Sequence, residues 1–491
     1  MEHIISPPLI LGKFIPSQRL QAILDALNRF YYSPAYLVTV AMLAILANVC
    51  SLELQIYTVY TLIYIVMCFI CRDLTPLTPL VILCYIIPSN ENNPGTSTTS
   101  IFFMGTGGEY VLFLAAVVIA TLLIRLSFDP HINFKSIIRG RYYLLPGMLL
   151  LGLAYMIGGI GVPGYSELAS KNIFFGFLQL VALALPYFVI ASTIRWESVP
   201  KDYFVYVGTA VGFVLVAELA NIYLTQGVIE NNIVKRELIY TGWGIHNNIG
   251  GMLTMMLPFP FYFSCKNRSS IPGILAGTLM MAGIVLSNSR SSMLVGALLY
   301  GICVIVTLVM SKDKLGAFIA VSVLFLGAVG MCIIFWEKIT SLFLIIAQSG
   351  LHANGRDEIY ANGIRQFLKY PLFGGTFYPL DYVPYDFSEI DAFSSFFPPR
   401  WHNTIIQLLA CCGIAGLSAY MLHCSQIFRV FSRKPSLSKS LIAISALALM
   451  VTSLFDCHFF NIGPVLFYSM SLTFAEKTSP PITRGKFERV N

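Results

Sequence analysis

Residues 271–310 read IPGILAGTLMMAGIVLSNSRSSMLVGALLYGICVIVTLVM, two apolar runs joined by the polar turn 287–292. A helix needs roughly 20 apolar residues to cross about 30 Å of hydrocarbon, so each run is long enough to approach or complete one crossing. We therefore predict two membrane spans, near 271–288 and 290–310. Their turn carries an arginine, Arg290, among serine and asparagine side chains.

The rest of the chain repeats this apolar pattern. Of its 491 residues 56% are hydrophobic and only 11% charged, with a mean hydropathy of +0.74, which excludes a soluble globular fold. Backbone groups in lipid must be satisfied within their own segment, and the alternation of barrel strands is absent, so we predict an all-α polytopic membrane protein. Candidate spans lie near 35–50, 54–71, 75–88, 109–127, 142–160, 172–194, 203–223, 245–264, 271–288, 290–310, 315–335, 403–428, 440–456 and 462–475. Two of these runs are short, which predicts twelve to fourteen transmembrane helices.

One long segment, 336–402, is too polar for lipid. It opens on Asn354-Gly355-Arg356 and closes on Arg400-Trp401-His402-Asn403. An apolar stripe predicts a helix at 356–369, Gly374-Gly375 predicts a turn, and the aromatic, proline-rich stretch 378–399 predicts an irregular lid. The expected division is a cytoplasmic segment 1–34 with an interfacial helix at 17–30, a helix bundle 35–335, the loop 336–402, helices 403–475 and a cytoplasmic tail 476–491.

The basic residues predict the orientation of the spans. With the N-terminus inside, 22 of the 31 Lys and Arg residues lie on the inner side, as the cytoplasmic bias of basic residues requires. The loop 336–402, the triplet His246-Asn247-Asn248, the turn 287–292 and the turn 456–461 then share the outer face. We expect both termini to be cytoplasmic.

Arg290 and Arg356 are the candidate anion-binding residues. An arginine at membrane depth is costly unless it faces a polar cavity, and a guanidinium beside a helix N-terminus suits a phosphate. Two arginines on one face could clamp a diphosphate. The alternatives are an interfacial Arg290 that reaches the lipid head groups and a surface Arg356 paired with Asp357 or Glu358.

His402 stands where the long loop meets the next span and is the candidate general base. The ordinary pKa of histidine, about 6.5, suits removal of a proton from a sugar hydroxyl at neutral pH. An interfacial side chain is the alternative. Further candidate substrate-binding residues are His246, Asn247, Asn248, Arg400, Asn403, Asp456 and His458, with helix capping as the other explanation for the His246 triplet and for Asp456 and His458. The eleven cysteines lie mostly in apolar runs without metal-ligand spacing, so neither a metal nor a disulfide framework is expected.

Several motifs in order resemble the bacterial O-antigen ligase and O-antigen polymerase superfamily. They are Ser289-Arg290 between two spans, Gly355-Arg356, the stretch 369–375 (KYPLFGG), the stretch 402–409 (HNTIIQLL) and 413–416 (GIAG). The resemblance implies a GT-C-like architecture and an inverting, metal-independent glycosyltransferase of the bacterial cytoplasmic membrane, without a cofactor. Its donor would be a glycan on undecaprenyl diphosphate, held by Arg290 and Arg356, and His402 would activate the acceptor hydroxyl.

The partners expected from this resemblance are the lipid-linked donor, a sugar hydroxyl acceptor and membrane lipids, with no nucleic acid. Polymerase and ligase differ only in the acceptor. A polymerase or a general glycopolymer transferase is slightly favoured, because a ligase requires an acceptor that the sequence does not name. The alternative of another class is a polysaccharide or lipid-linked glycan transporter or flippase. A transporter predicts internal repeats and broken helices at mid-membrane, whereas the polar residues here gather at the outer edge. A structural scaffold leaves Arg290 unexplained.

Overall fold

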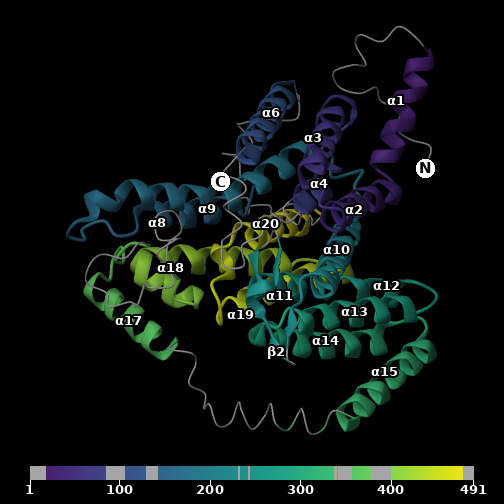
Figure 1. Cartoon of the computed structure of the whole chain (residues 1–491). Coiled ribbons are helices and arrows are strands. Elements are labelled where there is room, and N and C mark those ends of the chain that lie inside the picture. Colours follow the sequence, from purple (N-terminus) through teal and green to yellow (C-terminus); the bar gives the residue numbers. More distant parts are fainter. Residues whose placement is uncertain are drawn as a thin grey trace, which may run out of the picture.

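The computed structural model describes residues 18–84, 106–128, 142–230, 233–241, 244–334, 336, 340, 356–377 and 400–478. Most of them lie in helices (Figure 1), so the all-α prediction is confirmed. Within these ranges the strands are confined to two antiparallel hairpins, β1 (Ile229–Glu230) with β2 (Ile233–Val234) and β3 (Tyr240–Thr241) with β4 (Gly244–Ile245). Several predicted features lie outside the described residues. They are Gly355 with most of the stretch 337–355, the predicted lid 378–399, and the two ends of the chain, 1–17 and 479–491.

The helices follow the predicted spans closely. In chain order they are α1 (Gln18–Tyr31), α2 (Pro34–Val49), α3 (Glu53–Ile70), α4 (Leu77–Cys84), α6 (Thr106–Phe128), α8 (Leu145–Ile157), α9 (Tyr165–Thr193), α10 (Tyr203–Thr225), η2 (Arg236–Leu238), α11 (His246–Met256), α12 (Pro260–Lys266), α13 (Ile271–Leu286), α14 (Arg290–Met310), α15 (Lys314–Ile334), α17 (Arg356–Lys369), α18 (Thr404–Phe431), α19 (Leu437–Thr452), η3 (His458–Phe460) and α20 (Ile462–Lys477). The predicted loop helix 356–369 coincides with α17, and the predicted interfacial helix with α1.

Seven of the described helices are long and apolar enough to cross a membrane, or eight if the α1–α2 pair, bent by 68°, counts as one span. Each of the fourteen candidate spans coincides with a helix or, for 245–264, with the consecutive pair α11–α12. Several of these helices, such as α8, α13 and α19, are shorter than a full crossing. Membrane-spanning helices are thereby confirmed, while a count of twelve to fourteen stays a prediction.

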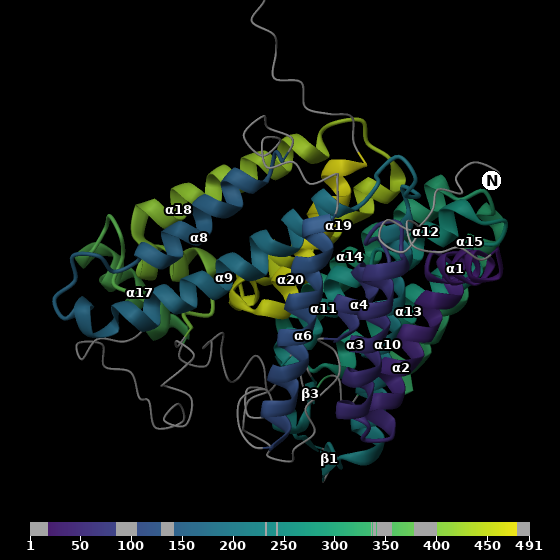
Figure 2. The same cartoon turned by 90° about the horizontal axis from the view of Figure 1, so that it is seen from above.

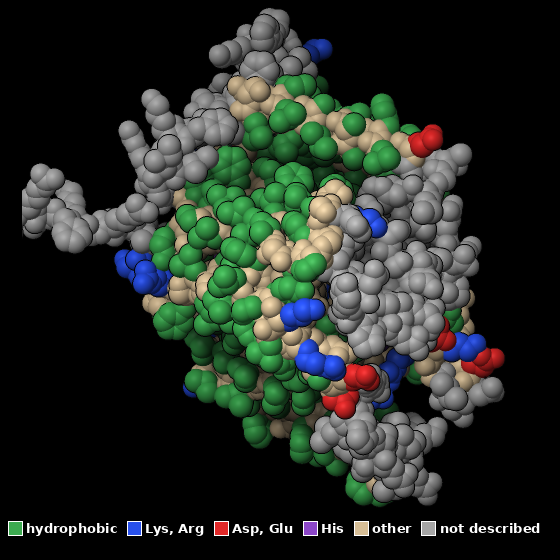
Figure 3. Space-filling model, turned by 90° about the vertical axis from the view of Figure 1, so that its left-hand side faces the viewer, with side chains coloured by type: hydrophobic (Ala, Val, Ile, Leu, Met, Phe, Trp, Pro, Cys, Tyr) green, Lys and Arg blue, Asp and Glu red, His purple; other side chains and the backbone are tan. Residues whose placement is uncertain are grey.

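Helix α11 lies inside the bundle and packs against α10, α13, α14 and α19. A second group, in which α8 packs against both α9 and α18, is joined to it through α20 (Figures 1 and 2). On the face shown in Figure 3, hydrophobic side chains form a broad area and the visible charged side chains lie along its edges. Such an apolar exterior is expected of helices that face lipid.

Helix α18 is interrupted at Gly413, where the backbone has φ 62° and ψ −155°. Glycine alone tolerates this region readily. The segment after α17 fills the break, because Ile414 N–H donates to Pro371 O over 2.8 Å and Gly375 N–H donates to Ala410 O over 2.7 Å. The interruption therefore fastens the middle of the polar loop, just after α17, to α18 without leaving these backbone groups unpaired.

Replacement of Gly413 by alanine is expected to destabilise the protein by about 1–3 kcal/mol, because the backbone is strained for any other residue. The added Cβ would also lie 2.5 Å from the carbonyl carbon of Leu372. A lower thermal unfolding midpoint in detergent would show the effect. The matched control is Gly301→Ala in α14, where nothing lies within 4 Å of the added Cβ. Equal midpoints for the two variants would contradict the prediction.

Candidate functional site

Five segments converge at one end of α11: the start of α11, the turn 287–292, the start of α17, the residues before α18, and the link between α19 and α20. Two glycines of α11 permit this approach. A Cβ on Gly250 would lie 2.6 Å from Ser287 Oγ and 2.7 Å from Ser292 Oγ, and one on Gly251 would lie 3.0 Å from His458 Nε2. The serine turn and the α19–α20 link therefore press against α11 at consecutive positions.

The serine turn presents Arg290 at the first position of α14. Asn288 provides the left-handed residue of the turn, with φ 55°, a conformation that asparagine tolerates better than most residues. Ser287, Ser289 and Ser292 are fully buried, whereas Arg290 is exposed. In the described part of the chain its guanidinium has no ion-pair or hydrogen-bond partner. A free guanidinium at a helix N-terminus is a favourable place for an anion.

Arg356 is the first residue of α17, and its Nη1 donates to Phe455 O in the α19–α20 link over 2.7 Å. This bond ties the loop helix to the link. Asp357 and Glu358 follow in the same helical turn and are both exposed. Within the described residues Arg356 forms an ion pair with neither, so the surface-pair alternative is not what the structure contains. One N–H of the guanidinium is held by this carbonyl, and the hydroxyl of Tyr360 also lies within hydrogen-bonding range of the group, so only part of it is left for a ligand.

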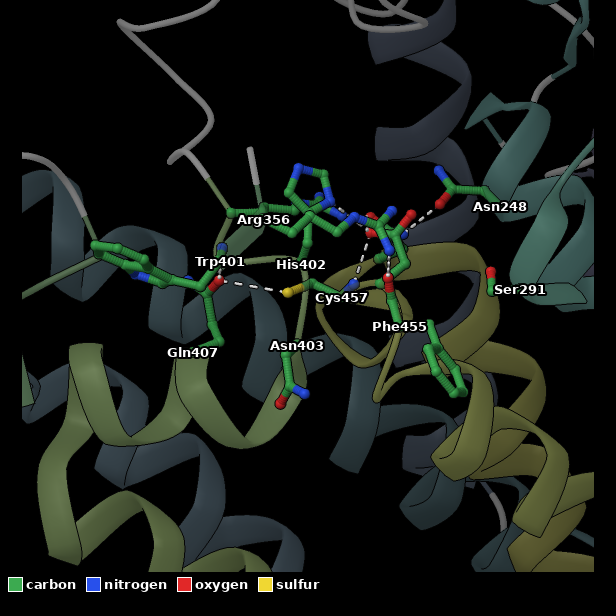
Figure 4. Close-up of polar contacts among 12 residues, drawn as sticks. Asn248, Ser291, Arg356, Trp401, His402, Asn403, Gln407, Phe455 and Cys457 are labelled. Carbon is green, nitrogen blue, oxygen red and sulfur yellow. Dashed lines mark hydrogen bonds and ion pairs between the residues drawn. The ribbon is translucent and has the colours of Figure 1, made fainter. Parts of the chain in front are cut away.

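His402 lies beside Arg356 and above the α19–α20 link (Figure 4). Its backbone is left-handed, with φ 50°, and Tyr360 Oη donates to its carbonyl oxygen over 3.2 Å. Strained residues of this kind persist where the surroundings hold them and are frequent at functional sites. The imidazole is 37% exposed, and its Nδ1 lies 3.3 Å from Asp456 Oδ1. The side chain is therefore oriented by a carboxylate and still reachable from outside.

Asp456 is buried, and burial alone would raise the pKa of its carboxyl group. The hydrogen bond from His402, the nearby imidazoles of His458 and His402, and Cys457 N–H, which donates to Asp456 Oδ1 over 2.7 Å, together hold that pKa below its ordinary value of 3.8. Asp456 is therefore ionised at neutral pH. Since a carboxylate only accepts hydrogen bonds, the His402 proton belongs on Nδ1, and Nε2 keeps the lone pair that a base needs.

Asn461, at the end of the same link, joins two segments that are distant in sequence. Its Oδ1 accepts a hydrogen bond from Arg400 Nη1, and its Nδ2 donates to Asn248 Oδ1 over 2.6 Å. Figure 4 shows Asn248 extending toward this cluster from α11. Asn461 is 8% exposed. A single amide thus sets the distance between the residues before α18 and the first turn of α11.

The structure distinguishes among the other predicted binding residues. Asn403 is the N-cap of α18: its Oδ1 accepts from the N–H groups of Ile405 and Ile406, and its Nδ2 donates to Leu454 O, which leaves little of the side chain for a ligand. His458 is fully buried against Gly251, so it lies beneath the site and is not exposed to a ligand. His246 and Asn247 are half-buried in the first turn of α11, whose N-cap is the residue before them.

Sequence reasoning did not assign Arg236 to the site. It begins the short helix η2, between the two hairpins that lead to α11. Burial lowers its pKa, and the charge of Arg290 lowers it further, which places the two arginines within electrostatic reach. Its neighbour Lys235 pairs with Glu230. The signal available in the sequence was a basic residue ten positions before the His246 triplet, in a connection already expected on the outer face.

The site is electropositive. Arg236, Arg290, Arg356 and Arg400 surround it. Asp456 is close to Arg400 and His402, and Glu237 is a second carboxylate near His246. Converging cations with few carboxylates favour an anionic ligand. Among the residues that the structure describes, no group of three His, Cys, Asp or Glu side chains is placed to hold a metal ion.

Acidification is expected to destabilise the protein in part through His458. Burial lowers the pKa of His458 from 6.5 in the folded protein. Below that pH the unfolded chain is protonated at this residue while the folded chain is not, so the free energy of unfolding falls as the pH drops. Asp456, whose pKa is also lowered, loses its contribution only below its ordinary value of 3.8. Thermal unfolding between about pH 7.5 and 5 should therefore show a weaker pH dependence in His458→Gln. The same slope in both proteins would contradict this assignment.

Removal of the Asn461 bridge is expected to cost more stability than removal of one of its partners. Asn461→Leu loses two hydrogen bonds, one of them to a charged group, and should destabilise the protein by about 2–3 kcal/mol. The control Asn248→Leu loses only the bond between the two amides and should cost about 1 kcal/mol. Chemical unfolding of both variants measures the difference. If the two costs are equal, the Arg400 bond contributes nothing.

The fold and the site define a multi-pass, all-α membrane protein with an arginine-rich polar site where several of its helices begin. Residues 275–421 match the family model described as O-antigen ligase, which confirms the resemblance to the O-antigen ligase and polymerase superfamily. The match includes Arg290, Arg356 and His402, and excludes the start of α11 and the α19–α20 link. No curated protein and no solved structure matches the chain. The family supports a glycosyl-transferring enzyme of the O-antigen ligase type, with lipid-linked glycan substrates, in polysaccharide assembly.

Proposed function

We propose that the protein is an inverting, metal-independent glycosyltransferase that moves a glycan from undecaprenyl diphosphate to a sugar hydroxyl. The observation that supports this most directly is the pairing of His402 with Asp456 beside Arg356, in a site that also contains Arg290. An oriented imidazole next to several guanidinium groups suits a reaction in which a hydroxyl loses its proton while a diphosphate leaves.

In the proposed reaction His402 Nε2 takes the proton of the acceptor hydroxyl. The oxygen attacks the anomeric carbon of the donor sugar, and the bond from that carbon to the diphosphate oxygen breaks. The electron pair of that bond stays on the diphosphate. A single displacement inverts the anomeric configuration. Asp456 stabilises the imidazolium that forms, because its carboxylate accepts from Nδ1.

Arg290 and Arg356 would hold the diphosphate, the former from the N-terminus of α14 and the latter from that of α17. Both arginines would contribute to binding of the donor. Their attraction for the diphosphate grows as negative charge develops on the leaving group, so they would also lower the barrier to transfer. His246, Asn247 and Asn248, in the first turn of α11, remain candidates for contact with the sugars. Arg400 would act by holding Asn461 in place.

The bias of basic residues supports an extracytoplasmic site in the bacterial cytoplasmic membrane, with residues 1–34 and 476–491 on the cytoplasmic side. In that orientation 336–402 is the outer loop between the bundle 35–335 and the helices of 403–475. Polymerase and ligase chemistry would use the same donor half of the site and differ in the acceptor. We favour the polymerase, in which the acceptor is a second lipid-linked glycan.

Purified protein in lipid nanodiscs tests the proposal. Given undecaprenyl-diphosphate-linked glycan in the presence of a metal chelator and without nucleotides, it should form longer lipid-linked glycans and release undecaprenyl diphosphate. The anomeric configuration of the product, read by NMR, should be opposite to that of the donor. Transfer that requires a nucleotide sugar, or retention of configuration, would overturn it. A flippase would move the intact donor across the bilayer and leave its glycosidic bond uncleaved.

A further inference from the structure

A second basic cluster lies where α3 and α9 end and α10 begins. At its centre Asp73 is 2% exposed. Its Oδ1 accepts from Tyr32 Oη over 2.9 Å and from Thr75 N–H over 3.0 Å, and its Oδ2 accepts from the backbone N–H of Arg195 over 3.1 Å. These donors are all uncharged. The carboxylate is therefore satisfied without an ion pair to either neighbouring guanidinium.

The two guanidinium groups are those of Arg72 and Arg195. In each of them Nε is buried and has no hydrogen-bond partner in the described part of the chain, and neither side chain forms an ion pair there. They are close to one another, because the charge of Arg195 contributes, after burial, to lowering the pKa of Arg72. The carboxylates of Asp73 and Glu197 offset part of this repulsion at Arg72. They leave both buried Nε–H groups without a hydrogen-bond partner, which is costly unless an external anion accepts from them.

The helix ends nearby do not require these arginines. The guanidinium of Arg125 already donates to the carbonyl of Cys68 in the last turn of α3, to that of the C-cap residue Cys71, and to Arg72 O. At the end of α9, Trp196 Nε1 donates to Ala191 O over 3.2 Å. Capping of a helix C-terminus, the usual reason for a basic residue there, is thus performed by other side chains.

This cluster and the candidate active site lie at opposite ends of α10. Tyr203, the first residue of α10, donates from its Oη to Thr75 O over 3.2 Å, while the last turn leads into the hairpins before His246 (Figure 2). Helix α10 has 23 residues. At 1.5 Å per residue it is about 34 Å long, which is enough to cross the hydrocarbon layer.

We propose that Arg72 and Arg195 bind the phosphate of an anionic lipid head group, at the membrane face opposite the candidate active site. Guanidinium forks match the oxygens of a phosphate, and the ends of membrane helices lie at head-group depth. Tyr32 and Trp196 border the cluster, and both residue types concentrate at membrane interfaces. The inference does not depend on the proposed glycosyltransferase activity.

Thermal unfolding in nanodiscs tests this site. The midpoint of the unaltered protein should rise when phosphatidylglycerol is added to a phosphatidylcholine bilayer. Arg72→Gln and Arg195→Gln should lose most of that rise, and their double variant all of it. The matched control is Lys201→Gln, an exposed basic residue of the same α9–α10 connection, which should keep the full rise. Equal rises in the arginine variants and the control would overturn the proposal.

Two further arms keep the test decisive. If the glutamine variants fail to fold, Arg72→Lys and Arg195→Lys retain the charge but lose the fork, and each should keep only part of the rise. An undiminished rise in both lysine variants would overturn the proposal. Inorganic phosphate added to the detergent-solubilised protein distinguishes the source of the anion. Stabilisation by phosphate equal to that by the lipid would assign the site to a free anion and overturn the lipid assignment.

Discussion

His402→Ala is expected to lower the rate of glycan transfer by at least about 100-fold, the usual contribution of a general base. The imidazole is oriented by Asp456, whose lowered pKa keeps the carboxylate ionised, and its Nε2 is left to receive the acceptor proton. An alanine side chain cannot take that proton. Initial rates of product formation at saturating donor measure the loss.

The companion variant His402→Gln separates chemistry from shape, since glutamine fills much of the same space but accepts no proton at neutral pH. It should be as inactive as His402→Ala, and both should bind the donor as tightly as the unaltered protein. Asp456→Asn should give a smaller loss, because an amide orients the ring less firmly and does not stabilise its positive form. Full activity in either His402 variant would remove this residue as the base.

Arg290→Gln and Arg356→Gln are each expected to weaken binding of the undecaprenyl-diphosphate donor by about 10- to 100-fold. A hydrogen bond to a charged group contributes about 1.5–3 kcal/mol, and each 1.4 kcal/mol is a factor of ten. The lysine variants should recover part of the affinity, because they keep the charge but not the fork. Donor titration followed by intrinsic fluorescence or by native mass spectrometry gives the dissociation constants.

Arg365→Gln is the matched control for Arg356, since it lies on the same helix, is exposed, and donates from its guanidinium to Asn362 Oδ1 within that helix. Its donor affinity should be unchanged, which distinguishes a specific clamp from the general positive field of the loop. The double variant Arg290→Gln with Arg356→Gln should bind no donor at working concentrations. Donor binding retained in the double variant would contradict the diphosphate clamp.

Much of the helical organisation was predictable from short stretches of sequence. The runs 271–288 and 290–310 became α13 and α14, and the stripe at 356–369 became α17 with the same bounds. Such features depend on the solvation of a segment's own backbone and on its own hydrophobic pattern, which neighbours in sequence determine. The candidates Arg290, Arg356 and His402 were found in the same way, because a charged or titratable side chain at the edge of an apolar run is conspicuous.

The contacts between these candidates depended on the tertiary structure. Asp456 is 54 residues from His402, and Asn461 is 213 residues from Asn248, yet each pair is joined by a hydrogen bond. No local pattern specifies such pairs. They require close approach to α11 at Gly250 and Gly251, and the role of these glycines is visible only once the opposing atoms are placed. The apolar pattern of the sequence by itself determines the helices and the position of Arg290 in a polar turn. Packing between distant helices determines that Asp456 lies beside His402 and that Arg236 lies near Arg290.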